Sequence, residues 1–298
     1  MHLAPFLIYV LSIFVLTAVT SYPTFLGLEA LGLRDMPFDE MVMRLLKLYG
    51  LLGLWPLLAS FGLNTRAGWG YGYGKSRDGR GFFNALLRGA AIGIGSMALV
   101  VVVLLALDIR VARPGVALGP LVLAVVLLKS VFAGLMVGFI EETWFRGALQ
   151  SSIAQVSNNA FAIVLISLVY GAMHFISSGI NIPADEVSWL SGTAVLFTSL
   201  HGFRDPAFYD SLFALVAGGL LLGLIRYRTG RIAECIGIHA GWVMVVKMLR
   251  HTTYPNADAA WSFMIGSYDG VVGILAGFWF SSLAVVYYLR YGRRTSAG

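Results

Sequence analysis

The chain has 298 residues, of which 58% are hydrophobic and only 12% are charged, and its mean hydropathy is +0.80. Soluble domains carry about 25% charged residues, and a water-exposed surface needs such charge to stay dispersed, so the composition excludes a soluble globular protein. The net charge of +6 does not indicate nucleic-acid binding, because the Lys and Arg residues lie at the ends of apolar runs, where they contact lipid headgroups.

Apolar segments follow one another along the whole chain. All but the fifth are long enough to cross about 30 Å of hydrocarbon as a helix, and the fifth is borderline. They cover residues 3–20, 41–63, 85–107, 116–140, 160–175, 207–225, 232–249 and 271–289. The sequence therefore predicts an all-α fold, a polytopic transmembrane bundle of about eight helices, with residues 1–298 forming a single integral membrane domain. The first segment lacks a preceding Lys or Arg and a following A-x-A site, so we expect a retained span rather than a signal peptide.

The loops between these segments predict an orientation. Basic residues gather in the second loop, in the sixth loop and after the last span, whereas acidic residues gather in the opposite loops. By the positive-inside rule we expect both termini in the cytoplasm. The second loop contains Gly74-Lys75-Ser76, but a phosphate-binding loop needs Gly where the chain has Trp69, so we expect a basic interfacial loop.

The pattern Glu141-Glu142-x-x-x-Arg146 directly follows the fourth apolar run. On a helix Glu142 and Arg146 lie four residues apart on one face and can form an ion pair, whereas Glu141 points about 100° away. One carboxylate is then neutralised and the other is available as a general base. The alternative interpretation is a charged helix end at the membrane surface with an ordinary ion pair.

Tyr170 and His174 lie late in the fifth segment, and their four-residue spacing predicts that phenol and imidazole share one helix face. Gly171 and Ala172 between them leave room for another helix to approach closely. A lone histidine at a helix end is more often a packing or interfacial residue, so this motif alone does not establish a site.

His239 lies within the seventh segment, next to Ala240 and Gly241, which again favour close packing around a polar group. Cys235 precedes it by four residues on the same face. A Cys/His metal pair is an alternative interpretation, although two donors at this spacing are a weak signal.

Three other polar residues lie outside these motifs. His201 and His251 occur in loop-like stretches, where we expect them to face water. Asp269, in the stretch 266–270, is expected to be a turn residue before the last span.

Glu141, His174 and His239 lie on three separate apolar segments. Because polar groups are excluded from the lipid-facing surface of a bundle, such residues can converge only in its interior. A carboxylate with imidazoles can activate a water directly, or can hold a divalent metal that does so. Either route gives a nucleophile for amide hydrolysis, and the second imidazole can stabilise the resulting oxyanion.

At these residues the sequence resembles the CPBP intramembrane protease family, which includes type II CAAX prenyl endopeptidases and bacteriocin-processing or immunity proteins of the Abi type. That family carries E-E-x-x-x-R, F-x-x-x-H and H-x-x-x-N motifs on separate membrane helices. Here the first motif is complete, the second has Tyr170 where Phe is usual, and the third begins at His239 but has Val243 in place of Asn. The resemblance covers roughly residues 120–250, which we interpret as a protease-like core.

The resemblance implies that Glu141 activates water together with His174, and that His239 helps to bind the oxyanion. If a metal is used, zinc or another divalent ion would be held by the same three residues; a metal-free mechanism is the alternative. Simple spans would place Glu141 and His174 near opposite ends of their segments. A long fourth segment, with Lys129 near one interface and Glu141 well inside, would remove this conflict.

The supporting residues implied by the resemblance are Glu142 and Arg146, which would shape the site. The Asn that Val243 replaces would be a second oxyanion donor, and losing one such donor typically costs about 100- to 1,000-fold in rate. Either another group replaces it, for which the Tyr170 hydroxyl is a candidate, or the protein is slow or inactive.

We therefore expect an intramembrane endopeptidase, a CAAX-protease-like peptide hydrolase acting on a membrane-tethered or hydrophobic peptide. The expected partners are membrane lipids and this substrate, with no nucleic acid, and the family's breadth predicts a bacterial inner membrane. The alternatives are a proton-coupled transporter, which the lack of an internal repeat disfavours, and a non-catalytic scaffold or immunity protein of the same fold.

Overall fold

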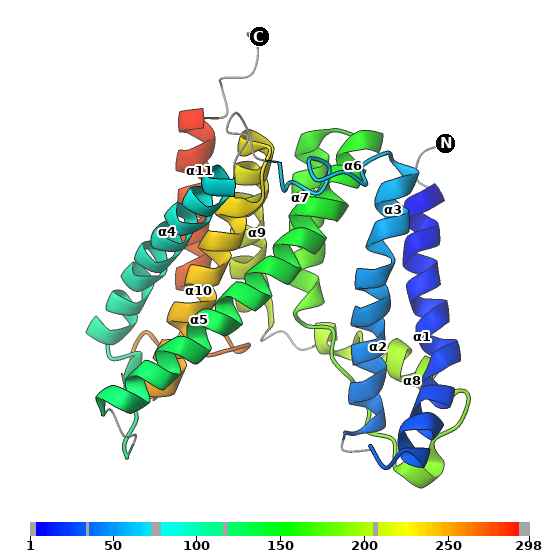
Figure 1. Ribbon diagram of the computed structural model, residues 1–298. Helices are drawn as coiled ribbons and strands as arrows, with labels where there is room; N and C mark the ends of the chain where they lie inside the picture. Colours follow the sequence, from blue (N-terminus) through cyan, green and yellow to red (C-terminus); the bar gives the residue numbers. More distant parts are fainter. Residues whose placement is uncertain (1–3, 34–35, 73–78, 116–118, 205–207, 292–298) are drawn as a thin grey trace. The chain divides into compact units, whose positions relative to one another are not determined.

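The computed structural model describes residues 4–33, 36–72, 79–115, 119–204 and 208–291, and most of the described chain is helical (Figure 1). The longer helices are α1 (Ala4–Ala30), α2 (Phe38–Leu52), α3 (Leu54–Ser60), α4 (Gly79–Ala106), α5 (Pro120–Glu142), α6 (Gln150–Val156), α7 (Asn159–Met173), α8 (Ser191–Thr198), α9 (Tyr209–Thr229), α10 (Ala233–Thr252) and α11 (Ile274–Tyr291). Short single turns are η2 (Ala184–Glu186), η3 (His201–Arg204) and η5 (Ser262–Met264), and η1 (Thr143–Leu149) joins α5 to α6. The strands β1 (Arg110–Ala112) and β2 (Thr253–Pro255) pair antiparallel, with Val111 opposite Tyr254.

Each predicted apolar segment corresponds to a helix, and six helical stretches are long and apolar enough to cross a membrane. These are residues 4–30, 38–60, 81–106, 120–156, 209–229 and 274–291. The borderline fifth segment forms the 15-residue α7, and the seventh forms α10, which carries charged residues in its first and last turns. The prediction of a polytopic transmembrane helical bundle is confirmed.

Contacts between residues divide the chain into two compact units, residues 1–64 with 172–206, and residues 65–171 with 207–298. In the first unit α1 packs against α2 and α8. The Tyr9 hydroxyl donates to the Gly50 carbonyl at 2.9 Å, and the Phe25 and Phe38 rings meet edge to face at 5.5 Å. That the whole chain forms one membrane domain stays a prediction.

In the second unit α10 lies between α4 and α5, and α9 packs against α11 (Figure 1). The close approach of α10 depends on glycines. A Cβ at Gly138 of α5 would lie 2.8 Å from the Ile236 carbonyl oxygen, and a Cβ at Gly241 would lie 2.7 Å from the Ala90 carbonyl oxygen of α4. The predicted small-residue packing beside His239 is therefore confirmed.

The helix that begins at Pro120 does not end at the glutamates. It passes from α5 into the π-helical turn η1 and on into α6, so that residues 120–156 form one 37-residue apolar stretch. The long fourth segment predicted from the sequence is confirmed, whereas the depth of Glu141 in the membrane stays a prediction. A π-helical turn inside an α-helix is rare and is found mostly at functional sites.

Candidate active site

The continuous helix corrects one interpretation of the glutamate pair. Glu141 and Glu142 are the last residues of α5, but η1 continues the helical path directly from Thr143. They lie in the interior of a 37-residue span and not at a helix end. The interpretation as a charged helix end is therefore wrong, whereas the position of the pair relative to the membrane surface stays a prediction.

Glu142 and Arg146 form the predicted ion pair. The Arg146 Nη1 donates to Glu142 Oε1 at 3.0 Å, and the two side chains are only 0% and 1% exposed. Arg146 also donates through Nη2 to the Gly219 carbonyl of α9 at 3.4 Å. Its guanidinium carbon lies 4.3 Å from the centroid of the Tyr170 ring, so the phenol face covers the buried cation.

His239 connects this pair to the second glutamate. Its Nδ1 lies 2.8 Å from Glu142 Oε1, and its Nε2 lies 3.8 Å from Glu141 Oε2. Because Glu142 Oε1 already accepts the Arg146 hydrogen bond, it acts as an acceptor here as well, and Nδ1–H of His239 is the donor. The His239 imidazole thus lies between the carboxylates of Glu141 and Glu142. Its hydrogen bond to Glu142 joins two residues that are 97 positions apart in the sequence.

The two glutamates have different environments. The Glu142 side chain is completely buried, whereas the Glu141 side chain is 26% exposed. This difference follows from the 100° turn between successive helical residues, which directs Glu142 to Arg146 and Glu141 away from it. The geometry gives Glu142 the neutralised, structural position and Glu141 the accessible one.

Tyr170 forms a wall of this cluster. It is 4% exposed, and its ring meets Phe145 edge to face at 5.2 Å and the His239 imidazole at 6.0 Å. Gly171 next to it allows α9 to approach, since a Cβ there would lie 2.8 Å from Val216 Cγ2. That the Tyr170 hydroxyl replaces a missing oxyanion donor stays a prediction.

His174 follows α7, which ends at Met173, and the Phe175 amide donates to the Ala172 carbonyl at 3.0 Å to close the last turn. It belongs to the first unit, whereas Tyr170 belongs to the second. The structure therefore brings five of the six predicted site residues together in one unit, Glu141, Glu142, Arg146, Tyr170 and His239. The participation of His174 stays a prediction.

The other sequence-based expectations have mixed outcomes. Cys235 does not pair with His239, because its buried thiol donates to the Leu222 carbonyl at 3.4 Å. The expectation that His251 faces water in a loop is wrong, since α10 extends to Thr252 and the Nε2 of His251 is buried. Asp269 is the expected turn residue, its Oδ1 accepting the backbone amides of Val271 and Val272. His201 begins the short turn η3.

Some residues around the cluster were not predicted from the sequence. The Tyr71 hydroxyl hydrogen-bonds Thr143, the residue after Glu142. Arg226 of α9 donates to the Arg146 carbonyl at 3.3 Å. Burial raises the pKa of the Tyr71 phenol, and its hydrogen bond to Thr143 opposes that effect. A tyrosine in a glycine-rich loop and an arginine at a helix end carry no motif that would have indicated these contacts.

The donor set suits a divalent metal in its chemistry. Carboxylate and imidazole are ligands that zinc takes, and a carboxylate behind Nδ1 fixes the orientation of a ligating histidine, as Glu142 does for His239. Glu141 and His239 provide two such donors 3.8 Å apart. Within the described ranges, no three His, Cys, Asp or Glu side chains are grouped closely enough to hold a metal ion.

Comparison with known proteins identifies the part of the chain that contains these residues. Residues 120–245 match the family described as type II CAAX prenyl endopeptidase Rce1-like. The match begins at α5 and includes Glu141, Tyr170, His174 and His239, and it supports the CPBP family predicted from the motifs. No curated protein and no solved structure matches the chain significantly.

Proposed function

Since residues 120–245 carry an Rce1-like domain of the CAAX-type intramembrane proteases, we propose that the protein hydrolyses a peptide bond of a membrane-associated substrate with a water activated by Glu and His. The observation that carries this proposal is the position of the His239 imidazole between two carboxylates, with Nδ1 on Glu142 and Nε2 near Glu141. A buried ion pair alone would stabilise a helix contact. A second, partly exposed carboxylate beside the same imidazole supplies an acid–base pair.

The charges of the cluster suit this chemistry. Glu141 and Glu142 carry two negative charges and Arg146 one positive charge, so an imidazolium at His239 makes the group neutral. A buried cluster without net charge avoids the large desolvation cost of an isolated charge. In that state Nδ1–H binds Glu142 and Nε2–H is directed towards the Glu141 side, where a reacting carbonyl would bind.

The reaction then needs one proton acceptor and one oxyanion donor. Glu141, with His174, takes a proton from water as the oxygen attacks the peptide carbonyl. The Nε2–H of His239 donates to the oxyanion of the tetrahedral intermediate. Glu141 then returns its proton to the amine as the C–N bond breaks, which leaves a carboxylic acid and a free amine.

Glu142 and Arg146 act on His239 without touching the substrate. Their buried pair fixes the tautomer and the ring orientation, and the Gly219 carbonyl and the Tyr170 ring fix Arg146. If a divalent metal is bound, Glu141, His174 and His239 would hold it, and it would lower the pKa of the attacking water. Both routes require Glu142 in the same position behind His239.

The substrate in this proposal is a membrane-tethered or hydrophobic peptide, reached from within a bacterial inner membrane in which both chain termini are cytoplasmic. The resemblance supports this choice, as does the position of both glutamates within the apolar stretch 120–156. Membrane lipids and the substrate are the proposed partners.

The proposal is tested by comparing peptide termini in native membranes that contain wild-type protein, Glu141→Ala or Glu40→Ala. Glu40 on α2 is an exposed glutamate in an i,i+4 pair with Arg44, so its substitution is a matched control. We expect termini that appear with wild type and Glu40→Ala and disappear with Glu141→Ala at an equal protein level. Identical termini in all three membranes would contradict the proposal.

Val243 favours one second candidate, a non-catalytic scaffold or immunity protein of the same fold. It stands four residues after His239, where the family has an oxyanion-donating Asn. A scaffold would retain its cellular effect in Glu141→Ala, whereas a protease would lose it.

A further inference from the structure

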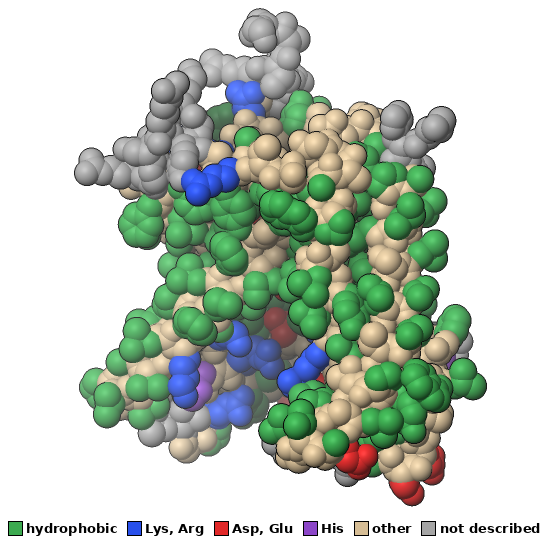
Figure 2. Space-filling view, turned by 45° about the vertical axis from the view of Figure 1, so that its right-hand side comes forward, with side chains coloured by type: hydrophobic (Ala, Val, Ile, Leu, Met, Phe, Trp, Pro, Cys, Tyr) green, Lys and Arg blue, Asp and Glu red, His purple; other side chains and the backbone are tan. Residues whose placement is uncertain are grey.

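A basic pocket lies between α5 and α10, away from the candidate active site. It has a volume of about 630 Å³ and is lined by Arg113, Val126, Lys129, Ser130, Ala133, Lys247, Arg250 and His251. No acidic side chain is among these residues. Figure 2 shows blue Lys and Arg side chains and a purple His gathered on the lower left of that view.

The basic side chains of this pocket have few partners in the protein. Arg113 donates to the Arg250 and Thr253 carbonyls at 3.2 and 3.3 Å. For Lys129, Lys247 and Arg250, no carboxylate of the described residues lies within ion-pair distance. His251 contributes a ring nitrogen, Nε2, that is buried without a hydrogen-bond partner. A pocket lined by four cations is therefore complementary to an anion.

A further cation interacts electrostatically with residues of this pocket and with a carboxylate. Arg110 of β1 is 2% exposed and donates to Thr253 Oγ1 at 2.8 Å and to the Gly270 carbonyl at 2.5 Å. Burial lowers its pKa, Asp269 opposes that effect, and the charges of Arg250 and Arg113 lower the pKa further. Asp269 therefore offsets one charge at most, and the pocket remains strongly positive.

The location of these cations is not explained by membrane orientation. Lys247 and Arg250 lie near the end of α10, whereas the Arg226–Arg231 group precedes its start. A 20-residue helix is about 30 Å long, which is the thickness of the hydrocarbon core. The positive-inside rule accounts for basic residues at one end of such a helix only.

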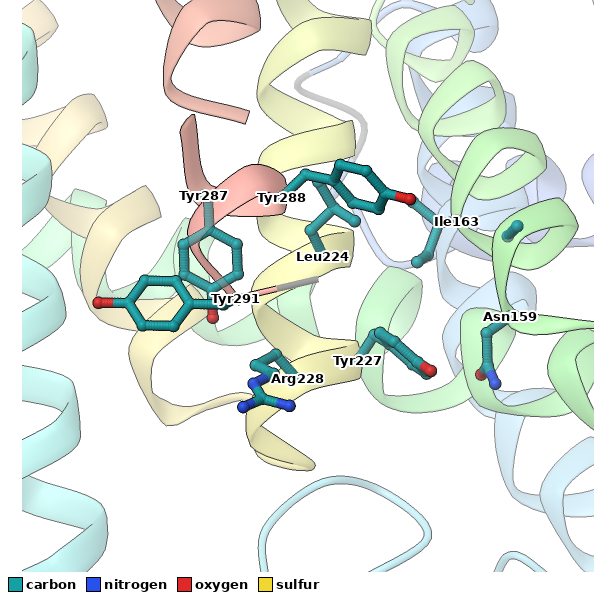
Figure 3. A pocket seen from close by; sticks show the side chains of 9 residues that line it. Asn159, Ile163, Leu224, Tyr227, Arg228, Tyr287, Tyr288 and Tyr291 are labelled. Atoms are coloured by element: carbon teal, nitrogen blue, oxygen red, sulfur yellow. The ribbon is translucent and has the colours of Figure 1, made fainter. Parts of the chain in front are cut away.

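A second pocket, lined by tyrosines, lies near the start of α10, at the opposite end of that helix from Lys247 and Arg250. It lies at the ends of α9 and α11, is lined by Tyr227, Arg228, Tyr287, Tyr288 and Tyr291, and has a volume of about 250 Å³ (Figure 3). Amphipathic aromatic rings of this kind gather where a membrane meets water. The basic pocket is lined by four cations and by no Phe, Tyr or Trp. Unlike the tyrosine-lined pocket, it is therefore suited to an anionic ligand.

The surroundings of the basic pocket suit a lipid better than a soluble anion. Lys129 is nine residues after the start of α5, about 14 Å along the span. The neighbouring α5 residues Leu128 and Phe132 are 69% and 67% exposed, and Leu121 is 78% exposed. They form an apolar surface beside the cations on which acyl chains can lie.

We propose that this pocket binds the phosphate of an anionic phospholipid. Lys129, Lys247 and Arg250 contact the phosphate oxygens, and the acyl chains pack on the exposed apolar face of α5. Basic pockets between membrane helices are known to take phospholipid headgroups. The binding does not depend on peptide hydrolysis.

The test uses the purified full-length protein in detergent, with phosphatidylglycerol as the probe and native mass spectrometry as the readout. Lys247→Gln/Arg250→Gln removes two pocket charges, and Arg44→Gln/Lys47→Gln on α2 removes two charges elsewhere. A single basic residue contributes a known amount to the binding of anionic lipid. We therefore expect the affinity for phosphatidylglycerol to fall about 5-fold for each charge removed, and about 25-fold for the pocket variant. The α2 variant is expected to bind as wild type does.

Several results would overturn the proposal. Two of them are an equal loss of phosphatidylglycerol affinity in both double variants, and binding of phosphatidylcholine as strong as that of phosphatidylglycerol. The others are displacement of the lipid by equimolar inorganic phosphate, or by a peptide with a free carboxylate. The first two would show nonspecific attraction, and the others a site for a soluble anion or a peptide end. If the double variant does not fold, Lys129→Gln alone reports on the same pocket, with an expected loss of about 5-fold; unchanged binding by that variant would also overturn the proposal.

Discussion

Replacing Glu142 by alanine tests the buried cluster. The substitution removes the carboxylate that accepts from Arg146 at 3.0 Å and from His239 at 2.8 Å. Arg146, which is 1% exposed, would keep a 3.4 Å hydrogen bond to Gly219 and the face of the Tyr170 ring. A buried guanidinium would then lack its counter-charge, and the imidazole would lose its fixed orientation.

The expected cost follows from the burial of the pair. Removing one partner of a buried ion pair typically destabilises a protein by about 3–5 kcal/mol, because the other charge stays buried and uncompensated. The exposed Glu40–Arg44 pair has the same i,i+4 spacing, with side chains 49% and 61% exposed. Solvent screens such pairs, so Glu40→Ala is expected to cost about 0.5 kcal/mol or less.

The assay is equilibrium unfolding of the wild type and the two variants by SDS in dodecyl maltoside micelles, followed by circular dichroism. A third variant, Glu142→Ala/Arg146→Met, removes both charges and is expected to recover at least 1 kcal/mol relative to Glu142→Ala, because no unpaired ion remains. If Glu142→Ala costs no more than Glu40→Ala, the Glu142–Arg146–His239 cluster is not the buried network described above.

Three further outcomes are expected. Cys235, buried and hydrogen-bonded to a carbonyl, should resist maleimide in native membranes and react only after unfolding, as gel-shift labelling would show; rapid native labelling would contradict its burial. Gly138→Ala places a Cβ 2.8 Å from a backbone oxygen and should destabilise the protein by about 1–3 kcal/mol in the same unfolding assay. Gly95 has open space around it, so Gly95→Ala should be neutral or should stabilise the protein by up to about 1 kcal/mol. Val243→Asn should restore an oxyanion donor and raise the cleavage rate of an identified substrate by up to about 100-fold; an unchanged rate would mean that another group already supplies that donor.

Local spacing predicted the parts of the structure that depend on one helix. The apolar runs predicted the helices, and the four-residue separation of Glu142 and Arg146 predicted their ion pair, because both follow from helical periodicity. The small residues beside His239, Ala240 and Gly241, likewise predicted close helix packing.

Contacts between distant segments could not be predicted in this way. The Glu142–His239 hydrogen bond joins residues 97 positions apart, and no spacing rule indicates which histidine nitrogen meets which carboxylate. The π-helical turn after Glu142 has no sequence signature, so the sequence indicated a long fourth segment but not the turn that continues it past the glutamates. His251 was expected to face water because hydropathy falls before Thr252, although α10 continues to that residue.

The claim that Glu141, His174 and His239 act on one water is tested most directly by joining two of these positions. Cysteines placed at 141 and 174, in a Cys235→Ser background, are treated in native membranes with a thiol crosslinker that spans about 5 Å. We expect an intramolecular crosslink that neither single-cysteine variant gives, since a shared water requires both groups within hydrogen-bond reach of one point. No crosslink in the double-cysteine protein, with both thiols shown to be reactive, would contradict a shared site.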